Sequence, residues 1–135
     1  MSRRYAVIDV GTNTLRLLVA EQVDGHLAAV HTDKELVRLG RDLAHDSRIS
    51  DQSLLHAGDA LRRFAAVARK LGAADLRIIA TSAAREAENG QDLAARVLAD
   101  TGHELEIIDE DEEADREEAA ERIVRAAKRR GEDIA

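Results

Sequence analysis

Apolar residues over the first forty positions fall into short runs separated by turn signals. Three stretches have the β-rich composition of strands, namely residues 5–10, 15–20 and 27–39. Gly11-Thr12-Asn13 separates the first two stretches and Asp24-Gly25 precedes the third. Alternation in the third stretch is clear only near its end, where Val37 and Leu39 would point inward. The pattern predicts three antiparallel strands.

The next stretch has the period of an amphipathic helix. Its apolar residues recur at alternating steps of three and four, at Leu54, Ala57, Leu61, Phe64, Ala68 and Leu71. Ser50 is a suitable N-cap for this helix, and Gly72 is a suitable stop. We therefore expect a long helix that buries one stripe of side chains.

Two further strands and two further helices complete the pattern. The sequence predicts a strand over 76–80, a helix over 91–101 that ends before Gly102, and a strand over 105–108. Residues 110–130 predict a last helix with acids early and bases late, and with a narrow apolar stripe at Ala120, Ile123, Val124 and Ala127. The order βββαβαβα predicts one α/β domain over 1–135, with a five-stranded mixed sheet and flanking helices.

Composition removes several classes of function. The 135 residues include no cysteine, so disulfides, thiolate zinc sites and thiol nucleophiles are excluded. Tyr5 and Phe64 are the only aromatic residues and the net charge is -7, so we expect no nucleic-acid partner. No apolar run reaches the length of a membrane span or signal peptide. We expect a soluble cytoplasmic protein without a membrane partner.

The turn after the first strand is the strongest candidate for chemistry. Gly11 is expected to adopt backbone angles closed to other residues, so that backbone N–H groups and the hydroxyls of Thr12 and Thr14 converge on an anion such as phosphate. Asp9, at the strand end, could hold a hydrated Mg2+. A plain hairpin turn explains the same residues equally well.

Three segments in order make a more specific signal. They are residues 6–18, which contain the turn, residues 80–89, and Ile107-Ile108 followed by Glu112-Glu113-Ala114. Together they resemble the N-terminal part of the exopolyphosphatase and guanosine pentaphosphate phosphohydrolase (Ppx/GppA) family, over about residues 5–114. Val37-Arg38-Leu39-Gly40 also fits the family pattern.

This resemblance implies a fold and a reaction. The family belongs to the actin-like ATPase superfamily, whose two RNase H-like lobes enclose a cleft, and the predicted element order matches one lobe. The implied reaction is phosphoanhydride hydrolysis of polyphosphate or guanosine pentaphosphate. The resemblance implies that Asp9 binds the metal and that Glu113 orients or deprotonates the attacking water. It implies that the phosphates are bound by Gly11, Thr12, Asn13, Thr14 and Arg85. Without the family context, we would interpret Arg85 as a cation on a helix surface. Glu113 would be interpreted as a solvated residue in the first turn of a helix.

The sequence also departs from the family pattern. Asp109-Glu110 stand where family members carry Ser-Gly, and two extra carboxylates facing the site would repel a phosphate. Family members continue after the position of Ala114 through an apolar helix into a second lobe, whereas this chain continues with the charged residues Asp115-Arg116-Glu117-Glu118 of the expected 110–131 helix. We therefore expect an isolated first lobe that binds phosphate or polyphosphate and is catalytically weak at most.

Two alternatives follow from the same residues. The chain could be a truncated or redesigned assembly module without activity, forming a homodimer through the stripe on the last helix, although packing of that stripe on the chain's own sheet is favoured. An RNase H-type nuclease needs several carboxylates around two metals, and Ala80-Thr81 offer no acid beside Asp9. The nuclease is therefore disfavoured.

Overall fold

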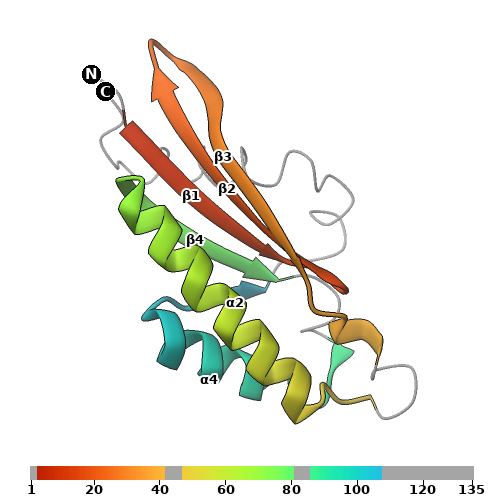
Figure 1. Ribbon diagram of the computed structural model, residues 1–135. Coiled ribbons are helices and arrows are strands. Elements are labelled where there is room, and N and C mark those ends of the chain that lie inside the picture. Colours follow the sequence, from red (N-terminus) through yellow and green to blue (C-terminus); the bar gives the residue numbers. More distant parts are fainter. Residues whose placement is uncertain (1–2, 42–46, 81–85, 108–135) are drawn as a thin grey trace.

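The computed structural model describes residues 3–41, 47–80 and 86–107. The elements follow in the order β1 (Arg3–Val10), β2 (Thr14–Val23), β3 (His26–Leu36), α2 (Asp51–Lys70), β4 (Ala73–Ala80), α4 (Gly90–Thr101) and β5 (Leu105–Ile107) (Figure 1). The expected helix over 110–130, its apolar stripe and the proposed dimer contact lie outside the described residues.

The strands form one five-stranded mixed sheet in the order β3-β2-β1-β4-β5. β1 and β2 pair antiparallel, as do β2 and β3, whereas β4 runs parallel to β1 and β5 runs parallel to β4. The predicted mixed sheet is confirmed. Because Val10 pairs with Ala80, and Ala80 with Ile107, the carboxyl ends of the three parallel strands meet at one edge. In open α/β sheets ligands bind outside such an edge.

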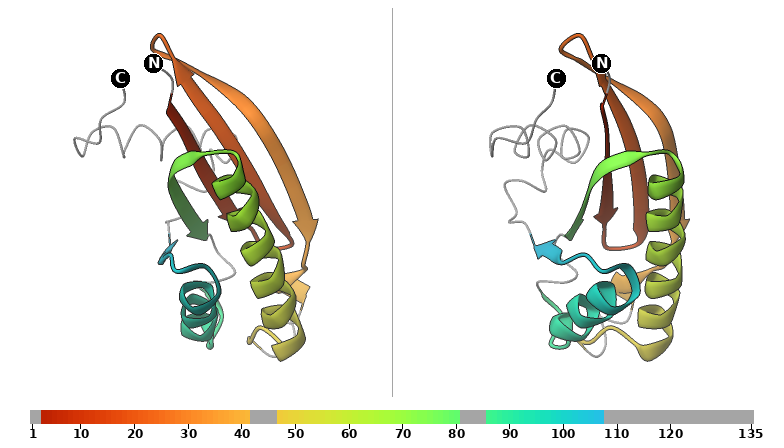
Figure 2. Two further views of the ribbon diagram at one scale, coloured as in Figure 1. Left: turned by 60° about the vertical axis from the view of Figure 1, so that its left-hand side comes forward. Right: turned by 90° about the vertical axis from the view of Figure 1, so that its left-hand side faces the viewer.

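α2 covers one face of the sheet, and α4 lies beside the N-terminal half of α2 (Figure 2). The predicted stripe is buried, with Phe64 at 0% exposure in one core cluster with Ile8 and Leu17 of the sheet. Ser50 is the N-cap, and its side chain accepts a hydrogen bond from the Ser53 N–H at 3.1 Å. This cluster thus consists of aliphatic side chains around Phe64, and Tyr5, the other aromatic residue, is also buried, at 2% exposure.

Turn and cap residues act as the sequence predicts. The Asp24-Gly25 pair, with φ of 51° and 81°, forms the two-residue connection between β2 and β3. Gly102 ends α4 with a φ of 77°, and its N–H donates to the Leu98 carbonyl at 2.9 Å.

The third strand ends earlier than the sequence indicates. β3 stops at Leu36, because Arg38 has a φ of 60° and turns the chain out of the sheet. Val37 and Leu39 are nevertheless buried in the core, so their inward orientation is confirmed although their strand conformation is not. The predicted alternation therefore identified the buried residues correctly, while hydrogen bonds to the distant turn at Thr12 and Asn13 determine the backbone conformation.

No helix within the described ranges combines the length and the apolar character needed to cross a bilayer.

Candidate active site

Asp9 lies at the edge where the parallel strands end. It is the penultimate residue of β1, and its neighbours across the sheet are Arg16 of β2 and Ile79 of β4. The residue is partly buried, and its Oδ1 atom is shielded from solvent.

The turn between β1 and β2 is closed by one backbone hydrogen bond. The Gly11 N–H donates to the Thr14 carbonyl at 3.1 Å, so this N–H is not available to an anion. Gly11 does not adopt a positive φ, and the expectation of unusual backbone angles there was wrong. The residue in the left-handed region at this edge is Arg38 instead.

The segment from Val37 to Gly40 packs directly on this turn. The Asn13 carbonyl accepts from the N–H groups of Val37 and Arg38, both at 2.8 Å, and the Thr12 carbonyl accepts from the Gly40 N–H at 2.7 Å. A Cβ atom at position 40 would overlap the Thr12 methyl group. The 37–40 segment therefore fixes the orientation of two peptide units in the turn.

This orientation determines where the N–H groups of the turn point. The described chain contains no cis peptide bond, and in a trans peptide the carbonyl and the next N–H point to opposite sides. Since the Thr12 and Asn13 carbonyls face the 37–40 segment, the N–H groups of Asn13 and Thr14 face away from it. The turn thus presents two successive donors on one side, an arrangement suited to an anion.

The residues present fit Mg2+ better than a metal held by protein ligands alone. Within the described residues, no group of three or more His, Asp or Glu side chains is placed to hold a metal. Mg2+ keeps several waters and commonly uses one or two carboxylates together with substrate phosphates. Asp9 beside an anion-suited turn meets that requirement, whereas a two-metal nuclease site would need further carboxylates, and β4 places only Ile79 and Ala80 beside this end of β1.

The structure places some of the expected site residues and leaves others untested. Asp9 and the turn residues Gly11 to Thr14 lie together at the sheet edge. Arg85 and Glu113 lie outside the described residues, so their roles stay predictions.

A buried amide near this edge was not anticipated from the sequence. Asn89, 6% exposed, accepts from the Ile49 N–H and donates to the Ile49 carbonyl, each at 2.8 Å. The Glu88 N–H donates to the Ser47 carbonyl at 2.8 Å. These bonds join the start of α4 to the start of α2. Asn89 precedes a helix in the sequence, which suggests an N-cap, but its side chain makes no capping bond.

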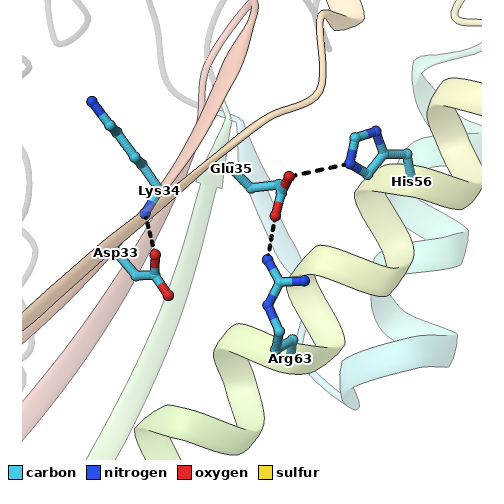
Figure 3. A network of polar contacts seen from close by, with 5 residues as sticks. All are labelled: Asp33, Lys34, Glu35, His56 and Arg63. Carbon is cyan, nitrogen blue, oxygen red and sulfur yellow. Dashed lines mark hydrogen bonds and ion pairs between the residues drawn. The ribbon is translucent and has the colours of Figure 1, made fainter.

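A polar network connects β3 to α2 near the same edge. Glu35 accepts from Arg63 and lies 3.5 Å from Nε2 of His56, and Figure 3 shows its side chain directed toward α2 while that of Lys34 points away. The hydrogen bond from Arg63 is the main reason why the pKa of Glu35 lies below its ordinary value of 4.5, and His56 lowers it further.

Comparison with known proteins gives consistent matches. The sequence profile described as the Ppx/GppA phosphatase family matches residues 18–131. Exopolyphosphatase 1 of Mycobacterium tuberculosis is 34% identical over 112 residues, which cover 82% of this chain and 33% of that protein. The guanosine-5'-triphosphate,3'-diphosphate pyrophosphatase of Vibrio cholerae is 31% identical over 110 residues, covering 82% of this chain and 22% of that protein.

Solved structures are similar over the same part. A crystal structure of an exopolyphosphatase from Cytophaga hutchinsonii matches with a TM-score of 0.79 and 29% identity, covering 83% of this chain and 36% of that one. The chain therefore spans between 22% and 36% of the length of these proteins.

Proposed function

This chain belongs to the Ppx/GppA phosphatase family, and on that premise we propose that its turn from Gly11 to Thr14 binds a phosphate of a phosphoanhydride substrate. Its mixed sheet and flanking helices are those of the N-terminal lobe of the solved family members, which have the actin-like ATPase fold. The substrate would be polyphosphate or guanosine pentaphosphate, the two ligand types named for its relatives.

One observation carries this proposal more than any other. The carbonyls of Thr12 and Asn13 are held by the 37–40 segment, so two N–H groups of the turn face the other side at the end of β1. Donors fixed before the ligand arrives need no reorganisation when it binds. Asp9 lies next to this turn and would hold Mg2+, whose charge would offset that of the phosphates.

Each residue then has a limited task. The N–H groups of Asn13 and Thr14 orient the phosphate, and Arg85 adds a positive charge to the phosphate chain. Glu113 orients or deprotonates the attacking water. Phosphoryl transfer depends mainly on positioning and on charge neutralisation, so these few groups supply the chemistry expected of one lobe.

Binding is the first test. Calorimetry with tripolyphosphate should show affinity about tenfold or more higher with Mg2+ than without it, as expected when a cation offsets phosphate charge. Asp9→Asn should lose this Mg2+ dependence. Asp24→Asn is the matched control, because it makes the same change in the β2–β3 turn, at the opposite end of the sheet. An equal Mg2+ effect in parent and Asp9→Asn would remove Asp9 from the site.

Catalysis is tested separately. Phosphate release from polyphosphate with Mg2+ is compared between the parent and Glu113→Ala. A lower rate in the variant supports the assigned role, whereas equal rates exclude Glu113 as the residue that activates water.

A further inference from the structure

Two adjoining hollows lie on the side of the turn occupied by the 37–40 segment. The smaller, about 420 Å3, reaches Asn13, and the larger, about 500 Å3, reaches Ser53 and His56 in the first two turns of α2. Leu36, Arg38 and Arg41 line both. We call these joined hollows the arginine groove. Both volumes fall in the range of small-molecule sites.

The charges around this groove favour an anion. No acidic residue lines either hollow among the described residues. Within the same ranges neither Arg38 nor Arg41 forms an ion pair, whereas Arg4, Arg62, Arg63, Arg77 and Arg96 each pair with a carboxylate. Arg38 and Arg41 are thus two neighbouring cations without carboxylate partners that line the same groove.

The backbone holds the two arginines on the same side. Arg38 has a φ of 60°, a conformation that costs a non-glycine residue about 1–3 kcal/mol. It is flanked by the buried residues Val37 and Leu39, and its side chain is exposed. The Arg41 N–H donates to the Arg38 carbonyl at 3.1 Å, which forms a single turn and brings Arg41 over Arg38.

The Glu35 carboxylate, on β3 just before the groove, is directed toward α2. Glu35 precedes the groove residue Leu36, and its side chain is bonded to Arg63 and contacts His56 on α2 (Figure 3). Its negative charge is therefore offset by Arg63 and does not neutralise Arg38 or Arg41.

We propose that the arginine groove is a subsite for a second phosphate group of the ligand whose first phosphate binds at the Gly11 to Thr14 turn. Asn13 connects the two positions, because its N–H lies on the side of the turn opposite the groove while the residue also lines the smaller hollow. The inference rests on the proposed function for the position of the first phosphate. Guanidinium groups bind phosphate oxygens through two parallel hydrogen bonds, and two of them within one groove match a group of two or more negative charges. The second phosphate could belong to a linear phosphate chain or to the 3'-diphosphate of a guanosine pentaphosphate.

The test compares ligands with one and with several phosphates. Calorimetry without Mg2+ measures the affinity of the chain for inorganic phosphate, tripolyphosphate and guanosine 5'-triphosphate 3'-diphosphate. The variant Arg38→Gly/Arg41→Gln removes both cations, and glycine at position 38 also relieves the positive φ, so the fold should be retained. Arg69→Gln is the matched control, since it removes an exposed cation in the last turn of α2, far from the groove.

We expect the double variant to lose about tenfold affinity per arginine for at least one of the two larger ligands, the size expected for a hydrogen bond between charged groups. Affinity for inorganic phosphate should change less than about twofold, as should every affinity of Arg69→Gln. A loss confined to tripolyphosphate indicates that the groove binds a linear phosphate chain. A loss confined to guanosine 5'-triphosphate 3'-diphosphate indicates that it binds the 3'-diphosphate. Unchanged affinity for both larger ligands, or an equal loss in Arg69→Gln, would overturn the subsite. The groove test can be interpreted even if Asp9→Asn keeps the Mg2+ dependence of the parent, because the affinities for the groove are measured without Mg2+.

Discussion

At the scale of single residues, the closest packing in the candidate site is between Gly40 and Thr12. The Gly40 N–H donates to the Thr12 carbonyl, and a side chain at position 40 would overlap the Thr12 methyl group. This contact keeps the 37–40 segment on the turn and so keeps the N–H groups of Asn13 and Thr14 on the opposite side.

Gly40→Ala should therefore destabilise the chain by about 1–3 kcal/mol, the usual cost of overpacking. Denaturant unfolding measures this change, and calorimetry with tripolyphosphate and Mg2+ should show weaker binding. Thr12→Ser removes the overlapping methyl group and keeps the hydroxyl, so Thr12→Ser/Gly40→Ala should recover most of both losses. If the double variant is no better than Gly40→Ala, the overlap is not the cause.

Asn89 has the second position-specific role. Its amide satisfies the buried N–H and carbonyl of Ile49, and Asn89→Ala would leave both groups without these partners. Two unsatisfied buried groups predict a loss of about 2–4 kcal/mol in the free energy of unfolding. Gln91→Ala, an exposed amide two residues later, should change it by less than about 0.5 kcal/mol. Equal effects of the two substitutions would contradict this role.

At the scale of elements, the Glu35 side chain links the edge strand β3 to α2. β3 is an edge strand with mostly exposed side chains, and Glu35 bonds to Arg63 on α2. Because the pKa of Glu35 is lowered in the folded chain, the stabilisation is fully present above its unfolded value of 4.5 and is lost as the pH falls through the lower folded value.

Glu35→Gln checks this contribution. The melting temperature of the parent should exceed that of the variant above pH 4.5, and the difference should shrink as the pH falls below 4.5. Added salt should also reduce it, since the contact is on the surface. A difference that grows toward low pH would contradict the direction of the pKa shift.

At the scale of the whole molecule, the sequence predicts the layered arrangement well. Periodicity identified α2 because its apolar stripe is continuous from Leu54 to Leu71, and the βα order required the parallel pairing of β1 with β4. The conformation of residues 37–40 could not be predicted, because it depends on hydrogen bonds to a turn 24 or more residues earlier in the chain. Nothing in the local sequence marks Arg38 as a residue of positive φ.

The candidate site was predictable only in part. The spacing of Asp9, Gly11 and Thr14 indicated a turn that binds an anion, and the family resemblance supplied the roles. The carbonyl contacts that orient the N–H groups, the arginine groove and the Asn89 amide all depend on long-range pairing. None of these has a signal in composition or periodicity.

The order of the strands in the chain has a consequence for how the nascent protein acquires its structure. β1, β2, β3 and the 37–40 segment are contiguous in sequence, so the Asp9 turn and its supporting contacts need no residue beyond Gly40. Short loops close at lower entropic cost than the long connection that brings β4 against β1, which spans the whole of α2. We expect pulse-labelled hydrogen exchange during refolding to protect amides of β1 and β2 before those of β4, and earlier protection of β4 would refute this order. A ribosome-bound fragment would then have the turn from Gly11 to Thr14 assembled while the rest of the sheet is still being synthesised.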